Sequence, residues 1–341
     1  MMISRIVIAL AAAVLAAPAG AQTLKIATLA PEGSQWVADM RAGAKEIKER
    51  TDGRVQLKLY AGGVMGNDNK VLRKIRIGQL HGAYFTATSL QEQYPDLNIY
   101  GLPFVYNSEE EVAHVRQQVD PILKAGLADI GYESFGFSGG GFARIMSQTP
   151  VTSLEDLDRQ KVWVPEGDNI SYRAMEAMGL SPVTLPVTDV LTGLQSGLLD
   201  IVGSPPVAAL VLQWHTKVKY VTDLPLVYTI GYLAIDRKAF GRLSDDDQAV
   251  VSEVLNNVSR TLDKANVADN VNALEALDNA GLTFVRPDPA AVSGWQQQVL
   301  AENREMAKEG LFSLELYERV LALLAEYRAA NDSVEATAAR N

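Results

Sequence analysis

The chain has 341 residues, a formal net charge of −10 at pH 7 and no cysteine. The acidic balance argues against a nucleic-acid partner, because phosphate backbones select basic surfaces. The lack of cysteine excludes disulfides, thiol catalysis and thiolate metal sites, and the length exceeds the usual single-domain range, so two lobes are expected.

The first 21 residues are expected to be a cleaved export signal. Arg5 precedes an apolar run at residues 6–17, and the small residues at 19 and 21 form a pattern that signal peptidase cuts. The run is too short to span a bilayer comfortably. We therefore expect cleavage after Ala21 and a periplasmic mature protein.

Strand and helix patterns then alternate along the chain. Apolar alternation at residues 24–26 and 55–59 predicts strands, and helical spacing at 37–47 predicts a helix that ends at Thr51-Asp52-Gly53. A second helix ends at Gly78 and a third strand follows. This repeated β-α-β order predicts an α/β fold with a mainly parallel sheet.

The same alternation resumes after Arg144 and predicts a second α/β lobe. A short strand is expected at residues 162–164, with helices at 169–178 and 187–196. Gly197 stands where a left-handed C-cap is wanted.

A long helix is expected after Ser244. Three aspartates at 245–247 suit a helix N-terminus, and apolar residues recur at helical spacing with no glycine or proline until Gly281. At 1.5 Å per residue this helix would be roughly 55 Å long, so it should run across both lobes.

Two extended segments, 132–146 and 232–236, are expected to cross between the lobes and form a hinge. The polar tail from Asn331 lacks a core pattern and is expected to fray. The expected division is residues 22–141 with 232–265 for the first lobe, 142–231 with 266–330 for the second, and 331–341 for a flexible tail.

Three segments carry a family resemblance: Thr51-Asp52-Gly53-Arg54, Gly141-Phe142-Ala143-Arg144, and residues 150–206. Together they resemble the solute-binding proteins of tripartite ATP-independent periplasmic (TRAP) transporters, the DctP type, over nearly the whole mature chain. The resemblance implies a two-lobed periplasmic-binding-protein fold with a hinge, for which a long helix spanning both lobes is a familiar feature. It also implies capture of a small organic acid, a carboxylate, and its delivery to the small and large membrane subunits of an ion-gradient permease at the inner membrane.

Arg144 is the first candidate for solute binding. It follows Ser138-Gly139-Gly140-Gly141, where missing side chains would leave room for a ligand, and a guanidinium can hold a carboxylate through two parallel hydrogen bonds. In the family, an arginine at this point contacts the substrate carboxylate. The alternative is an arginine that ties the hinge to a local Asp or Glu.

Trp163 is a departure from the family. Members usually carry Lys-(Ile/Val)-Arg-Val-Pro, whose arginine is the principal salt-bridge partner of the solute, but here the motif is Lys161-Val162-Trp163-Val164-Pro165. The indole could stack on a ring-bearing or unsaturated solute, or on a cation, or it could fill the space that the arginine left. A short dicarboxylate is therefore a less secure ligand than membership alone implies.

Two further candidates follow in the second lobe. Glu166 could accept hydrogen bonds from solute hydroxyls or an amine, or cap the next helix with Asp168. Ser204 occupies the place of the family's ligand-contacting asparagine. The family's neighbouring glutamate is also absent, so neither a metal nor another cofactor is expected beside the solute.

The first lobe offers Gln35 and Trp36 at a helix start, where free N–H groups favour an anion, and Tyr84 at the end of a strand facing the presumed cleft. Both aromatic residues could instead belong to the core.

Enzyme motifs are missing. The chain has no Gly-x-Ser-x-Gly elbow, Walker loop or His-Glu-x-x-His, so no catalytic residue is expected. The alternatives are a periplasmic lyase or hydrolase on the same fold, using Arg144 with Glu166, and an extracytoplasmic sensor that presents bound solute to a receptor.

Overall fold

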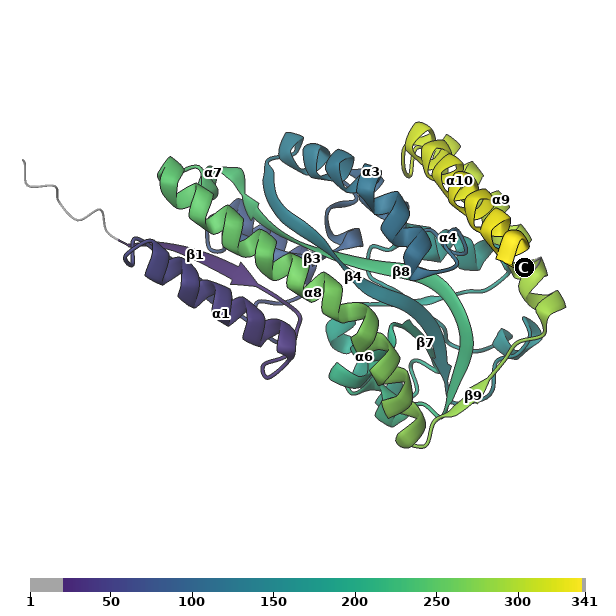
Figure 1. Ribbon diagram of the computed structural model, residues 1–341. Coiled ribbons are helices and arrows are strands. Elements are labelled where there is room, and N and C mark those ends of the chain that lie inside the picture. The colour runs from purple at the N-terminus through teal and green to yellow at the C-terminus, as the bar shows by residue number, and fades with distance from the viewer. Residues whose placement is uncertain (1–20, 339–341) are drawn as a thin grey trace, which may run out of the picture.

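The computed structural model describes residues 21–338 (Figure 1). The expected export signal therefore lies, apart from Ala21, outside the described residues. Within residues 21–338, no helix combines the length and the apolar composition needed to cross a bilayer.

One mixed sheet joins both parts of the molecule, with the strand order β2-β1-β3-β8-β4-β7 and β9 beside β8. Its strands are β1 (Gln22–Ala27), β2 (Val55–Tyr60), β3 (Gly82–Thr86), β4 (Tyr132–Ser147), β7 (Ile201–Ser204), β8 (Tyr220–Asp236) and β9 (Thr283–Val285). The pairs β1–β2 and β1–β3 are parallel, as the β-α-β pattern predicts. A separate parallel pair consists of β5 (Trp163–Pro165) and β6 (Val183–Leu185).

Helices cover the sheet and connect its strands. The α-helices are α1 (Gln35–Arg50), α2 (Asp68–Arg76), α3 (Glu109–Asp129), α4 (Asn169–Ala177), α5 (Val190–Ser196), α6 (Pro206–Val211), α7 (Arg237–Phe240), α8 (Asp245–Asn279), α9 (Pro289–Lys308) and α10 (Leu314–Ala338). The 3-10 turns are η1 (Ala87–Leu90), η2 (Pro95–Gly101), η3 (Glu155–Leu157), η4 (Val187–Asp189) and η5 (Trp214–Lys217). The helix expected at 187–196 thus begins with the turn η4, and Gly197 ends α5 in the predicted left-handed conformation, with φ 71°.

The long helix α8 confirms the expectation that one helix runs across both lobes. Its 35 residues would extend about 52 Å at 1.5 Å per residue. Figure 1 shows it running obliquely across the sheet, and it packs on α1, β4 and α6. Val251 and Val254 of its first half lie in the core with β1 and α1, whereas Leu277 near its end lies in the core around Trp163.

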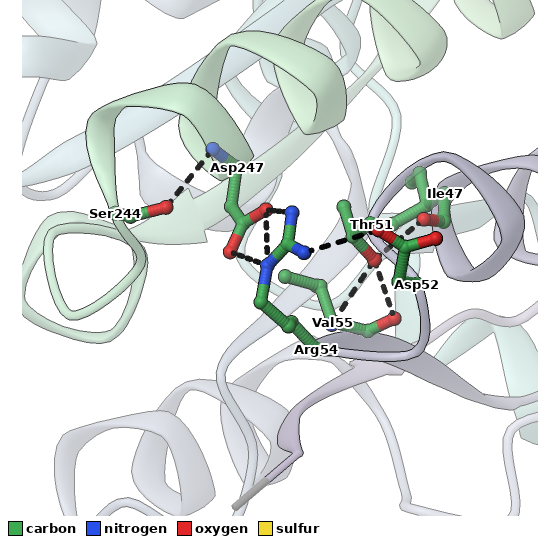
Figure 2. Close-up of polar contacts among 7 residues, drawn as sticks. All are labelled: Ile47, Thr51, Asp52, Arg54, Val55, Ser244 and Asp247. Carbon is green, nitrogen blue, oxygen red and sulfur yellow. Dashed lines mark hydrogen bonds and ion pairs between the residues drawn. The ribbon is translucent and has the colours of Figure 1, made fainter. Parts of the chain in front are cut away.

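The start of α8 is anchored to the start of β2 by the Thr51–Arg54 motif (Figure 2). Arg54 Nη2 lies 2.9 Å from Asp247 Oδ1, and its Nε lies 3.2 Å from Oδ2. Thr51 Oγ1 donates to Ile47 O and accepts from the Val55 N–H, which closes the turn between α1 and β2. The hydrogen bonds from Arg54 lower the pKa of Asp247. The motif is therefore a structural joint between β2 and α8.

The strands β4 and β8 are the long connections between the lobes, 16 and 17 residues in length. Their pairing is interrupted by register shifts before, within and after the segment Gly139–Gly141. Arg116 of α3 and Asp263 of α8 fasten this crossing. Arg116 Nη1 lies 2.7 Å from Asp263 Oδ1, Arg116 Nη2 donates to Phe137 O, and Asp263 Oδ1 accepts from the Gly139 N–H at 2.8 Å.

The three glycines before Arg144 serve packing within the protein. A Cβ at Gly139 would overlap the Tyr228 hydroxyl, one at Gly140 would overlap Thr229 Oγ1, and one at Gly141 would lie 2.5 Å from Asn270 Nδ2. The expectation that these absent side chains leave room for a solute is therefore wrong, because side chains of β8 and α8 occupy that space.

The last helix differs from the sequence-based division in two ways. Its buried residues Leu316, Val320 and Leu324 share the core of Val112 and Val115 in α3, on the first-lobe side, although residues 266–330 are assigned to the second lobe by the sequence pattern. The helix also continues to Ala338, past Asn331, where that pattern indicates a fraying tail.

Candidate solute-binding site

A cavity of about 270 Å³ lies between the two predicted lobes. Helix α2 and the turn η1 form its first-lobe wall, and the segments that follow β5 and β6 form its second-lobe wall. The first wall presents hydrogen-bonding side chains, which include Asn67, Asn69, Thr86, Thr88, Ser89 and Gln91. The second wall consists of Pro165, Glu166, Gly167, Pro186 and Val187.

A second cavity, of about 330 Å³, lies between α7 and the first part of α8, and Glu133, Arg237 and Gln248 line it. All its lining residues belong to the first predicted lobe, so lobe movement would not enclose a solute there. The inter-lobe cavity is therefore the candidate site.

Glu166 is the sequence-predicted site residue that the structure places in the inter-lobe cavity. Its Oε2 accepts a hydrogen bond from Asn67 Nδ2 at 2.7 Å, which joins the two lobes across the cavity. Asn67 in turn caps α2, since its Oδ1 accepts from the Lys70 N–H. The helix-capping alternative for Glu166 does not apply, because Asp168 caps α4 by accepting from the Ser171 N–H at 2.9 Å.

Asp68 lies at the α2 end of the cavity and was not singled out by the sequence. Its Oδ2 accepts from Thr86 Oγ1 at 2.9 Å and from the Ser89 hydroxyl. Burial raises the pKa of the Asp68 carboxyl, and the two hydroxyl donors oppose that effect. These contacts hold the β3–η1 connection against the first turn of α2.

Gln91 provides a buried acceptor in the same wall. The residue is 6% exposed, and its Oε1 has no hydrogen-bond partner within the part of the chain that the structure describes. Leaving a buried acceptor unpaired costs about 1–3 kcal/mol. A donor on a bound solute would remove that cost.

Arg144 lies outside the cavity lining and has a protein partner. Strand pairing sets it opposite Ser204, and its Nε lies 3.4 Å from Asp223 Oδ1. The other oxygen of Asp223 lies 3.4 Å from Arg286 Nε. The side chain of Arg144 is only 18% exposed, so the geometry matches the alternative of an arginine tied to a local Asp.

Ser204 and Trp163 are also engaged within the second lobe. Ser204 is buried and its Oγ donates to Pro205 O at 3.0 Å. Trp163 is 5% exposed, its ring centroid lies 5.2 Å from that of Trp214, and its Nε1 donates to Leu185 O at 2.9 Å. Both the apolar face and the N–H of the indole are occupied, which favours the space-filling alternative.

The first-lobe candidates lie on the α1 side of the sheet. The rings of Trp36 and Tyr84 are 4.8 Å apart and pack on the core beneath α1 and α8, and burial raises the pKa of Tyr84 to about 12. Gln35 Nε2 donates to Asp39 Oδ1 on the exposed face of α1. None of the three lines the inter-lobe cavity. Among residues 21–338, no cluster of histidine and carboxylate side chains could hold a metal ion.

The sequence matches the bacterial extracellular solute-binding proteins of family 7 (DctP) over residues 26–309. The solute-binding protein RD1_1052 of Roseobacter denitrificans is 30% identical, and the alignment covers 87% of this chain and 93% of that protein. The C4-dicarboxylate-binding periplasmic protein DctP of Rhodobacter capsulatus is 24% identical over 77% of this chain and 80% of its own.

Solved structures share the fold. The TRAP periplasmic solute-binding protein of R. denitrificans with bound L-galactonate has a TM-score of 0.78 at 24% identity, covering 89% of this chain and 99% of that one. The sugar acid binding protein DctPAm of Advenella mimigardefordensis in complex with galactonate has a TM-score of 0.83 at 18% identity, covering 90% and 98%. These likenesses confirm the two-lobed α/β fold, and with the sequence matches they establish that the chain belongs to family 7 of the bacterial extracellular solute-binding proteins.

Proposed function

We propose that this protein is the periplasmic solute-binding subunit of a TRAP-type transporter. It captures a small, hydroxylated organic acid between its lobes and delivers it to the small and large membrane subunits. A solute can stabilise the closed form only by its difference in affinity for the open and closed states, so contacts from both lobes are required.

The observation on which this proposal rests is the polar cavity between the lobes, with the buried acceptor Gln91 in its wall. Hydroxyl, amide and carboxylate side chains suit a solute that carries several hydroxyl groups. The L-galactonate bound to the R. denitrificans relative is a compound of this kind, which supports the same class here.

A binding role without catalysis is also part of the proposal. The family consists of extracellular solute-binding proteins. A lyase or hydrolase would convert the solute, whereas a binding protein would release it unchanged.

The test is a thermal-shift and calorimetric screen of aldonates, uronates and C4-dicarboxylates, followed by mass analysis of the recovered compound. Unchanged solute and a concentration-dependent rise in Tm are expected. At a concentration 100 times Kd, binding adds about 2.7 kcal/mol to the free energy of unfolding. Appearance of a product would contradict the proposal, and so would the lack of any shift.

A variant of Gln91 makes the test specific to this cavity. Gln91→Met keeps the size of the side chain and removes the unpaired acceptor, so affinity for the hydroxylated acid should fall about fivefold to tenfold while the free protein loses no stability. Gln79→Met, at an exposed glutamine outside the cavity, is the matched control. Unchanged affinity in Gln91→Met would remove Gln91 from the site.

A further inference from the structure

We propose that the carboxylate of the solute is held by the first lobe, through Arg73 and Arg76 of α2, and not by an arginine of the second lobe. The inference rests on the proposed function, because it assigns one part of the same cavity.

Arg73 and Arg76 are the cationic residues of the cavity lining. They stand three positions apart on α2, so both side chains project from the same face of the helix. Both are exposed, and in the part of the chain that the structure describes neither guanidinium forms an ion pair or a side-chain hydrogen bond. Two arginines without carboxylate partners can offer a planar, bidentate site to an incoming carboxylate.

Among the described residues, the second lobe contributes no cationic side chain to the lining of the cavity. Arg144 forms an ion pair with Asp223, and Arg286 pairs with the other oxygen of the same carboxylate. Arg144 does not line the cavity. At position 163 an indole is buried in the core, and its N–H is bonded to Leu185 O. Moving Arg144 onto a solute would leave Asp223 with the exposed Arg286 as its remaining ion-pair partner.

The acidic residues of the cavity set the direction in which the solute lies. Asp68 begins α2, and Glu166 faces the N-cap Asn67, so both carboxylates lie near the N-terminal end of the helix. Along the helix axis Arg73 is about 8 Å and Arg76 about 12 Å from Asp68, at 1.5 Å per residue. A carboxylate is therefore favoured at the arginine end, and hydroxyl groups are favoured near Asp68 and Gln91.

The separation of the arginines from the acidic residues along α2 also disfavours a solute with a second carboxylate group. A dicarboxylate that reached from the arginines toward Asp68 would bring its other charge close to Asp68 and Glu166, and like charges repel at short range in a partly enclosed site. The site is thus built for monocarboxylates with a hydroxylated chain.

The experiment measures binding of L-galactonate, its neutral 1,4-lactone and succinate by calorimetry. The double variant Arg73→Ala/Arg76→Ala should lose at least about tenfold in affinity for L-galactonate, since each charged hydrogen bond is worth about tenfold or more. Binding of the lactone should change little, and succinate should bind more weakly than L-galactonate. Lys70→Ala, which removes a charge from α2 outside the cavity lining, should stay within about twofold of the wild type.

Arg144→Ala decides between the two lobes. Retained affinity in Arg144→Ala together with loss in the double variant supports the first-lobe anchor. The opposite pattern, in which Arg144→Ala loses L-galactonate and the double variant keeps it, overturns the inference while leaving the proposed function intact. If the wild type binds none of the three compounds or any other acid of the screen, the proposed function fails and the inference fails with it. Because both arginines of the pair are exposed, the double variant should keep the melting temperature of the free protein.

Discussion

Replacing Trp163 tests whether this indole is a part of the core or a platform for the solute. At 5% exposure, it buries most of the 150–250 Å² that an aromatic side chain covers. Taking roughly 200 Å² at about 25 cal/mol per Å², its burial is worth about 5 kcal/mol. Trp163→Ala should therefore lower the free energy of unfolding by about 3–5 kcal/mol, the usual range for such a truncation.

Two further variants at position 163 test the hydrogen bond of the indole N–H and the effect of the family's arginine. Trp163→Phe keeps an aromatic ring against Trp214 and removes the donor to Leu185 O, so it should cost about 1–3 kcal/mol. Trp163→Arg restores the residue that the family usually carries. The sequence pattern alone predicts that this variant would prefer compact dicarboxylates as ligands. The structure predicts a different result, because a cation in this apolar core has no partner and should prevent stable folding.

Guanidinium unfolding followed by far-UV circular dichroism gives the stability of each variant, and calorimetry gives its affinity for the solute. Tyr172→Ala, at an aromatic residue of the same lobe that is 37% exposed, is the control and should cost much less than Trp163→Ala. A stable Trp163→Ala protein, within about 1 kcal/mol of the wild type, with at least a tenfold loss of solute affinity, would refute the space-filling assignment.

Two other predictions concern the hinge and the start of α8. Gly139→Ala should destabilise the protein by at least about 2 kcal/mol in urea unfolding, because its Cβ would overlap the Tyr228 hydroxyl; a neutral result would contradict the packing role of the glycine. Hydrogen bonds from Arg54 lower the pKa of Asp247 in the folded state, so the stability contributed by this carboxylate is present above its unfolded pKa of about 4 and is lost as the pH falls through the lower folded value. Asp247→Asn should therefore reduce stability at pH 7 and flatten the fall in stability below about pH 4, and an unchanged acid limb would exclude this pair as a source of acid sensitivity.

The elements that the sequence predicts correctly depend on local periodicity. Helix α8 follows from apolar residues at helical spacing and from Ser244 with its acidic first turn, and Ser244 Oγ does accept from the Asp247 N–H. The left-handed cap at Gly197 follows from one residue and its neighbours. Such features need no knowledge of which distant segments meet.

The role of a glycine or an arginine depends on those distant segments. The three consecutive glycines at 139–141 are compatible with a solute beside the backbone and equally with close packing of protein side chains. The positions of Tyr228 and Asn270 in the folded structure decide for close packing. Arg144 and Asp223 are 79 residues apart, so their contact has no local signal in the sequence. A family motif identifies where an arginine stands, but not whether a carboxylate of the same chain already lies beside it.

The residues that line the cavity could not be predicted from the sequence as site residues, for a related reason. Asn67 and Asp68 have the composition of an ordinary helix start, and Arg73 and Arg76 that of an exposed helix face. They line one cavity only because the fold places α2 beside the second lobe, where its N-cap Asn67 donates to Glu166. Within residues 21–338, Arg73 and Arg76 form no ion pair with a protein carboxylate. The loss of an arginine at position 163 is then compatible with continued acid binding, because a cleft with walls from both lobes can take its counter-ion from either wall.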